Sequence, residues 1–151
     1  MDALDRNLID LFTTEPRVGV LEASRRLGVA RGTVQARLDK LEASGVVTGW
    51  GPGLSPEALG FGVTAFLTLE ISQAGGHDAV AARLAAIPEV LEVCTITGAG
   101  DLWCRVVSRS NPDLQRVLDR VLSLEGVVRS ATVMALATLV PHRVRPLVQV
   151  S

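Results

Sequence analysis

Basic side chains are concentrated in one stretch of the chain, from Pro16 to Lys40. This stretch carries six Lys and Arg residues against two acidic residues, so its local charge is +4, although the whole chain has a formal charge of −1. Clustered Arg and Lys side chains neutralise the phosphates of a nucleic-acid backbone. The pattern favours local binding to nucleic acid, and the near-neutral total excludes coating of nucleic acid or membranes through overall charge. The basic residues are Arg17, Arg25, Arg26, Arg31, Arg37 and Lys40.

Two short helices joined by a sharp turn are the elements predicted to position these side chains. Apolar spacing indicates a helix from about Val20 to Leu27, Gly28 supplies a turn residue, and another helix begins near Ala30. Ser24 is small and lies four positions before Gly28, which lets the helices approach as a helix-turn-helix requires. In that motif the start of the second helix enters the major groove. Its base-facing candidates are Arg31, Gly32, Thr33 and Gln35.

Residues 1–50 are predicted to form one helical domain around this motif. Apolar side chains recur at helical spacing before Pro16 and again in a stripe that ends before Gly45. Residues 46–50 then have strand character, which suggests a winged type of helix-turn-helix. Gly and Pro crowd together in residues 51–62, which predicts a linker. For any single arginine of the domain, an ion pair with a neighbouring acid competes with a phosphate contact.

Residues 63–151 are predicted to form a second domain in which strands and helices alternate. The order strand, helix, strand, strand, helix, strand is typical of the ferredoxin-like βαββαβ arrangement, so the fold class is α+β. Asn111 is expected to cap the second of these helices, with Pro112 at its first position. The expected strands are Val63 to Ile71, Val90 to Thr97, Leu102 to Ser108 and Val127 to Val140.

The predicted sheet carries apolar side chains on both faces, although two helices cover only one of them. Leu91 and Val93 are expected to point away from the side of Val90, and Trp103 away from the side of Leu102. An uncovered apolar face needs a partner. We therefore expect a homodimer formed through the sheet.

Residues along the whole chain occur in the order and spacing of a known family. In the first domain they are Leu4, Asp5, Ile9, Arg17, Gly28, Thr33, Val34, Arg37, Leu41, Glu42, Gly45, Val46 and Val47, and beyond it Leu59, Gly60, Thr97, Gly98 and Asp101. On these residues the chain resembles the Lrp/AsnC, or feast/famine, transcriptional regulators. It departs from the family pattern at Ala23 and Ser24, at Trp50, and at Ala30, which replaces a capping Ser.

The resemblance implies a sequence-specific regulator that binds double-stranded DNA and responds to a small effector, commonly an amino acid. It further implies dimers that often assemble into octamers, with effectors bound near the turn between the two central strands. Glycine amides suit a carboxylate and Asp101 suits an ammonium group, although hairpin geometry alone also accounts for these residue types. The expected effector-binding residues are Gly98, Ala99, Gly100, Asp101 and Thr132.

Two other functions remain open from the sequence. Tetrapyrrole decarboxylases of the sirohaem type resemble the same two-domain architecture, and His142 beside Arg143 and Arg145 is the candidate site for such an enzyme. A metabolite-binding module without DNA activity is the other alternative. We expect no catalytic residue, metal site or cofactor. Cys94 and Cys104 lack the Cys-x-x-Cys pattern, which argues against a zinc site or a disulfide scaffold.

The sequence also predicts a location. No apolar run approaches the roughly 18 residues of a membrane-spanning helix. The first residues lack the basic and then apolar order of a secretion signal. We therefore expect a cytoplasmic, nucleoid-associated protein without a membrane partner.

Overall fold

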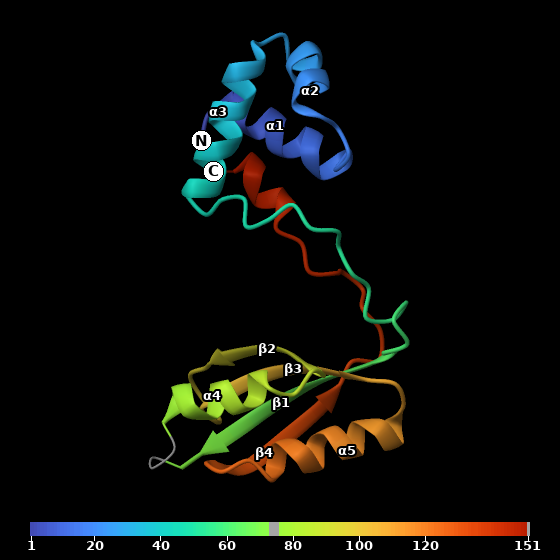
Figure 1. Cartoon of the computed structure of the whole chain (residues 1–151). Coiled ribbons are helices and arrows are strands. Elements are labelled where there is room, and N and C mark those ends of the chain that lie inside the picture. Colours follow the sequence, from blue (N-terminus) through green and yellow to red (C-terminus); the bar gives the residue numbers. More distant parts are fainter. Residues whose placement is uncertain (73–75, 151) are drawn as a thin grey trace. The chain divides into compact units, whose positions relative to one another are not determined.

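The computed structural model describes residues 1–72 and 76–150. The chain divides into two compact units, one formed by Met1–Gly53 with Val140–Ser151 and the other by Leu54–Leu139 (Figure 1). The first unit is helical, and the second contains a sheet with two helices. The mixed architecture confirms the α+β fold class predicted from the sequence.

Three helices form the first unit around a small apolar core. They are α1 (Ala3–Thr14), α2 (Val20–Leu27) and α3 (Arg31–Ala43). α1 begins at a capping box made by Asp2 and Asp5, and α2 ends at Gly28, which adopts the left-handed conformation with φ +66°. The glycine at the end of α2 explains why its predicted C-terminal bound is correct. The buried core residues are Leu8, Ala23, Val34 and Leu38.

The strand expected at residues 46–50 is wrong. Val46 and Val47 both donate their backbone N–H groups to the carbonyl of Leu41, so these residues close the C-terminal end of α3. Gly45 makes the reversal possible with φ +72°. The apolar side chains that suggested a strand therefore belong to a helix-ending turn.

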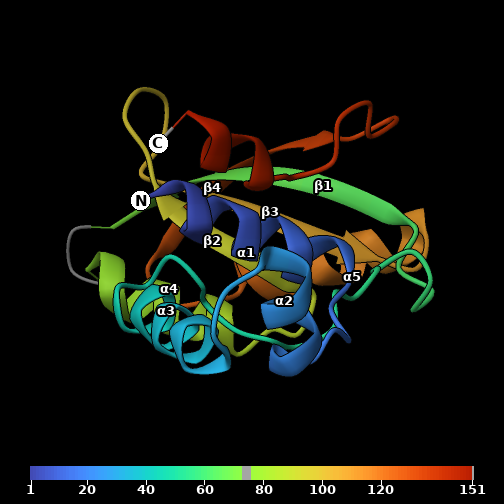
Figure 2. The same cartoon turned by 90° about the horizontal axis from the view of Figure 1, so that it is seen from above.

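The C-terminal segment packs in the first unit, whereas the sequence analysis assigned it to the second domain. Its short 3-10 helix η1 (Arg145–Gln149) contacts α1 on the side away from α2, as Figures 1 and 2 show. Arg145 Nε lies 2.9 Å from Asp10 Oδ1, and Gln149 Nε2 donates to Asp10 Oδ2 at 2.9 Å. One carboxylate on α1 thus holds two side chains of η1.

The second unit is an antiparallel four-stranded sheet with the strand order β2-β3-β1-β4. One buried cluster contains the inward side chains of the sheet, such as Leu67 and Cys104, and those of both helices, such as Leu84 and Val117. The two helices therefore cover the same face. The elements are β1 (Val63–Ile71), α4 (His77–Ala85), β2 (Val90–Thr95), β3 (Leu102–Ser108), α5 (Asn111–Leu122) and β4 (Val127–Met134).

The last strand is shorter than predicted. β4 ends at Met134 rather than Val140, and its final backbone bond runs from the N–H of Ala135 to the carbonyl of Thr64. Its partner β1 begins at Val63, so no backbone groups of β1 remain to pair with residues further along. A strand cannot extend beyond the strand that hydrogen-bonds to it.

A bulge in β2 corrects the predicted facing of its side chains. Val90 pairs with Val106, but Glu92 already pairs with Arg105, so Leu91 is an extra residue on its strand. Val90 and Val93 consequently pack against the same buried core, instead of on opposite faces. Leu91 itself is exposed.

The first turn of α5 is capped by Ser110, not by Asn111 as predicted. Ser110 Oγ accepts the backbone N–H of Asp113 at 3.2 Å, and Asn111 is already helical. We expect Ser110→Ala to lower the free energy of unfolding by about 0.5–2 kcal/mol. Asn111→Ala is the matched control and should change it little. Urea denaturation followed by circular dichroism compares the two, and equal losses would contradict the assignment of the cap.

Candidate nucleic-acid interface and ligand-binding loop

The turn between α2 and α3 has the geometry of a helix-turn-helix. Ser24 is buried and donates its hydroxyl to the Leu21 carbonyl at 2.8 Å, and its own backbone carbonyl accepts the N–H of Val29 at 3.1 Å. Ala23 is fully buried beside it. These small side chains let α2 pack closely on α3, and the left-handed Gly28 turns the chain between them. The sequence-predicted motif is therefore formed.

α3 presents one buried stripe and one exposed face. Val34, Leu38 and Leu41 are buried, which turns the side chains of Arg31 and Gln35 outward. The N-terminus of α3 has no side-chain cap, because Ala30 stands at the cap position. Uncapped N–H groups at the positive end of a helix are suited to a phosphate oxygen. The exposed start of α3 thus combines backbone donors with basic side chains.

The candidate basic residues fall into two groups in the structure. Within residues 1–72 and 76–150, Arg17, Arg31 and Lys40 are exposed and form no ion pair. Arg26 is instead bound to Glu15 at 2.6 Å and Glu22 at 3.0 Å. Those two carboxylates raise the pKa of Arg26. The first group is available to phosphates without breaking a contact, whereas Arg26 already uses Nε and Nη1 for two carboxylates.

The remaining DNA candidates of this region are also placed. Arg25 lies 4.0 Å from Glu22 with 70% of its side chain exposed, so that pairing is loose. Thr33 is exposed on the first turn of α3. Gln35 Nε2 donates to Asp39 Oδ1 at 2.8 Å along the same exposed face. A base edge could replace Asp39 as the partner of this amide.

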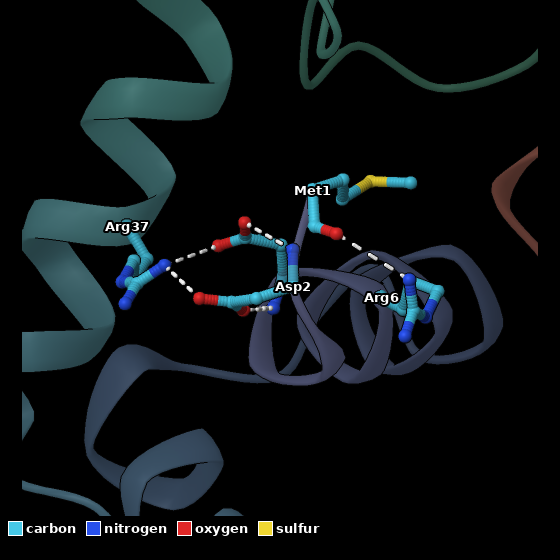
Figure 3. A network of polar contacts seen from close by, with 5 residues as sticks. Met1, Asp2, Arg6 and Arg37 are labelled. Atoms are coloured by element: carbon cyan, nitrogen blue, oxygen red, sulfur yellow. Dashed lines mark hydrogen bonds and ion pairs between the residues drawn. The ribbon is translucent and has the colours of Figure 1, made fainter. Parts of the chain in front are cut away.

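Arg37 points to α1 rather than to solvent. Its Nη1 donates to Asp2 Oδ2 and, at 3.1 Å, to Asp5 Oδ1 (Figure 3). Asp5 is buried, and the Arg37 side chain is 32% exposed. The backbone N–H of Asp5 and the guanidinium of Arg37 lower the pKa of Asp2. The sequence could not show this arrangement, because the acids lie more than 30 positions before Arg37.

The loop between β2 and β3 is fastened to the end of β1. Asp101 Oδ2 accepts the backbone N–H of Ile71 at 2.8 Å, and the N–H of Asp101 donates to the Leu69 carbonyl at 2.8 Å. Gly98 and Gly100 have φ +105° and +93°. Hairpin geometry therefore accounts for both glycines and for one carboxylate oxygen of Asp101. The side chain nevertheless stays partly exposed at the loop.

Thr132 is not brought to this loop within one chain. It pairs with Leu67 across β1 and β4, and Leu67 is buried beneath the helices. Thr68 is the neighbour that faces Gly100, and its side chain lies on the opposite face of β1 from that of Leu67. Thr132 therefore lies on the other side of the sheet from the contact between Thr68 and the loop.

The sheet face opposite the helices carries an aromatic pair that the sequence analysis only partly identified. The rings of Phe66 and Trp103 are stacked with centroids 5.3 Å apart. The guanidinium of Arg105 lies 5.8 Å from the Phe66 centroid and 6.0 Å from that of Trp103. Its Nε lies 3.5 Å from Glu92 Oε2 and is buried without a hydrogen bond. Phe66 and Arg105 are cross-strand partners on β1 and β3, and this pairing depends on the register of the two strands.

Two family models match the chain. The AsnC-type helix-turn-helix domain matches residues 1–42, and the Lrp/AsnC ligand binding domain matches residues 64–145. These matches, together with the fold, define a DNA-binding transcriptional regulator with a ligand-binding domain. The chain belongs to the Lrp/AsnC family, which confirms the resemblance seen in the sequence.

Individual relatives cover nearly the whole chain. The HTH-type transcriptional regulator FL11 of Pyrococcus furiosus is 32% identical over 136 residues, covering 90% of this chain and 89% of that protein. The structure of Escherichia coli AsnC is 25% identical, with a TM-score of 0.88, and covers 97% of this chain and 99% of its own. A Neisseria meningitidis transcriptional regulator in complex with L-Met is 27% identical, with a TM-score of 0.80 and 93% coverage of both chains.

Three further observations concern the described part of the chain. None of its helices has the length and apolar character needed to cross a membrane. No group of three or more His, Cys, Asp or Glu side chains is arranged there to hold a metal ion. Burial raises the pKa of the Cys104 thiol to about 11, so this thiol stays protonated at neutral pH.

Substitution of the two loop glycines tests the packing of the loop on β1. Alanine at either positive-φ position adds backbone strain of about 1–3 kcal/mol. A Cβ at Gly100 would in addition lie 2.5 Å from Thr68 Cγ2, whereas a Cβ at Gly98 meets nothing within 4 Å. We expect Gly100→Ala to lower the free energy of unfolding clearly more than Gly98→Ala in urea denaturation. Equal losses of unfolding free energy for the two variants would mean that Gly100 is not in close contact with Thr68 on β1.

Proposed function

We propose that this regulator binds double-stranded DNA through α2 and α3 and that a small amino acid bound at the 98–101 loop alters this binding. The observation that carries the proposal is the exposed start of α3, where Arg31 stands beside an uncapped helix N-terminus. Thr33 and Gln35 read base edges, since they lie on the first turns of the recognition helix. The residues that contact phosphates are Arg17, Arg25, Arg26, Arg31 and Lys40.

We also propose that the protein works as a homodimer formed through the uncovered sheet face. Phe66 and Trp103 stack on that face, and Val133 beside them is 65% exposed. Apolar and aromatic surface of this kind is buried efficiently against a second copy. A dimer also presents two copies of α3 to two half-sites of an operator. Assembly of dimers into octamers remains a further step of the proposal.

The ligand proposal rests on the chemistry of the loop. The glycine-rich run Gly98, Ala99 and Gly100 exposes backbone groups to a carboxylate, and Asp101 offers a negative charge to an ammonium group. The similar Neisseria regulator is described in complex with L-Met, which supports an amino acid as the class of ligand. Thr132 joins such a site only from a neighbouring subunit, given its place on the other face of its own sheet.

Binding rather than catalysis is the proposed activity, and the cytoplasm with its nucleoid DNA is the proposed location. The relatives described above are transcriptional regulators. For the decarboxylase alternative, the candidate cluster around His142 would need a free Arg145, but this side chain is bound to Asp10. A metabolite-binding module without DNA activity would leave the exposed basic residues of α3 without a role.

Arg31 and Gln35 should affect DNA binding in different ways. Arg31→Ala removes a positive charge, so it should weaken binding to every DNA and reduce the slope of log K against log salt by about 0.9 for each phosphate contact it loses. Gln35→Ala should leave that slope unchanged and relax the sequence preference at one position. Fluorescence anisotropy at several salt concentrations, with selected and random duplexes, measures both. Identical behaviour of the two variants would contradict these assignments.

Asp101→Asn tests the ligand site without loosening the loop. Asparagine keeps an oxygen that accepts the N–H of Ile71, but it removes the charge proposed to bind an ammonium group. We expect the amino acid that raises the melting temperature of the unmodified protein to lose that effect, with DNA affinity in its absence retained. A thermal-shift panel of amino acids that includes L-methionine provides the measurement. Undiminished stabilisation would remove Asp101 from the site.

A further inference from the structure

The capping box at the start of α1 fixes the orientation of the two carboxylates that bind Arg37. In the capping box, Asp2 Oδ1 accepts the N–H of Asp5 at 2.9 Å, and Asp5 Oδ2 accepts the N–H of Asp2 at 3.1 Å. Each carboxylate therefore keeps one oxygen, Asp2 Oδ2 or Asp5 Oδ1, for the Arg37 guanidinium. We name these three residues the α1–α3 clamp (Figure 3).

The clamp acts on a helix that is otherwise held by a small apolar core. The core cluster of the first unit contains four buried residues, of which Val34 and Leu38 belong to α3, and Leu41 is the third buried side chain of this helix. The start of α3 lacks a side-chain cap. Arg37 lies one helical turn after Thr33, so fixing Arg37 also fixes the rotation of the preceding turn about the helix axis. An ion pair with a buried carboxylate adds a directional contact to this apolar packing.

We propose that Arg37 is a positioning residue for DNA recognition, which sets the orientation of α3 by binding Asp2 and Asp5 and does not itself neutralise a phosphate. This proposal rests on the proposed DNA-binding function. It changes the role that the sequence analysis gave to Arg37, because both acids that bind its Nη1 lie on α1 and their two negative charges offset the positive charge that a phosphate would meet.

The salt dependence of DNA binding separates the two roles. Arg37→Ala should weaken binding to a selected site by about tenfold or more, the scale of a lost charge-assisted hydrogen bond, and leave the slope of log K against log salt unchanged. Arg31→Ala is the matched control, since loss of a phosphate contact lowers that slope by about 0.9. A comparable fall in the slope for Arg37→Ala would overturn the proposal.

Asp2→Asn removes one of the two negative charges that bind Arg37. It keeps the helix cap, because Asn is as good an N-cap as Asp. If Arg37 is a positioning residue, the ratio of affinity for the selected site to that for random DNA should fall about threefold or more, the scale of a weakened charge-assisted hydrogen bond. If Arg37 binds phosphate, loss of a competing acid should raise affinity for both DNAs equally and leave the ratio unchanged. An unchanged ratio therefore overturns the proposal. All binding is measured well below the unfolding temperature, where a loss of stability alone does not move the ratio.

A measurement without DNA keeps this proposal separate from the proposed function. Hydrogen exchange followed by mass spectrometry should show faster exchange in peptides that cover α3 when Asp2→Asn is compared with the unmodified protein. Changes confined to peptides of α1 would overturn the clamp. Failure of the unmodified protein to bind any DNA would contradict the proposed function, and the exchange result would still decide whether the clamp orients α3.

Discussion

The packing of α3 against the rest of the first unit is the constraint on which DNA recognition depends. Its three buried side chains occupy one stripe, which leaves the other side chains of the helix facing outward. Ala23 and Ser24 are small enough for α2 to approach that stripe closely. Because the core is small, polar contacts must supply much of the precision that a larger core supplies through packing. The α1–α3 clamp is one such polar contact.

The second unit meets a different constraint, since its helices cover only one face of the sheet. On the other face, Arg105 rests against two aromatic rings and keeps a buried Nε without a hydrogen bond. A buried donor without an acceptor costs free energy. A second copy that brings a hydrogen-bond acceptor to Arg105 Nε would remove that cost. The face would then gain both burial of its apolar side chains and a partner for this donor.

Local signals in the sequence were sufficient for most of the elements. Gly28 ends α2, and the turn composition after β2 frames the start of β3, because glycine acts on its own stretch of chain. The sequence failed where a partner decides the outcome. Residues 46–50 have strand-forming side chains but no strand to pair with, and β4 stops where β1 begins. The bulge at Leu91 likewise depends on the register with β3.

The candidate site follows the same rule. The position of the helix-turn-helix could be predicted, because spacing along one helix sets which side chains share a face. The partners of its arginines could not be predicted, since Arg26 and Arg37 bind acids that lie 11 and up to 35 positions away. A local charge count therefore overstates the basic surface, and only the structure separates exposed cations from those already bound.

The return of the chain to α1 has a topological consequence. Because η1 is held by Asp10, the first unit contains both the opening helices and the end of the chain. The path leaves this unit after Gly53 and comes back at Val140, so the two units are joined by two connections in parallel. A single connection permits free swivelling, whereas a doubled one forms a closed ring that excludes full rotation and lowers the entropy of the joint. The ring is closed on the side of the first unit by the contacts of η1 with Asp10.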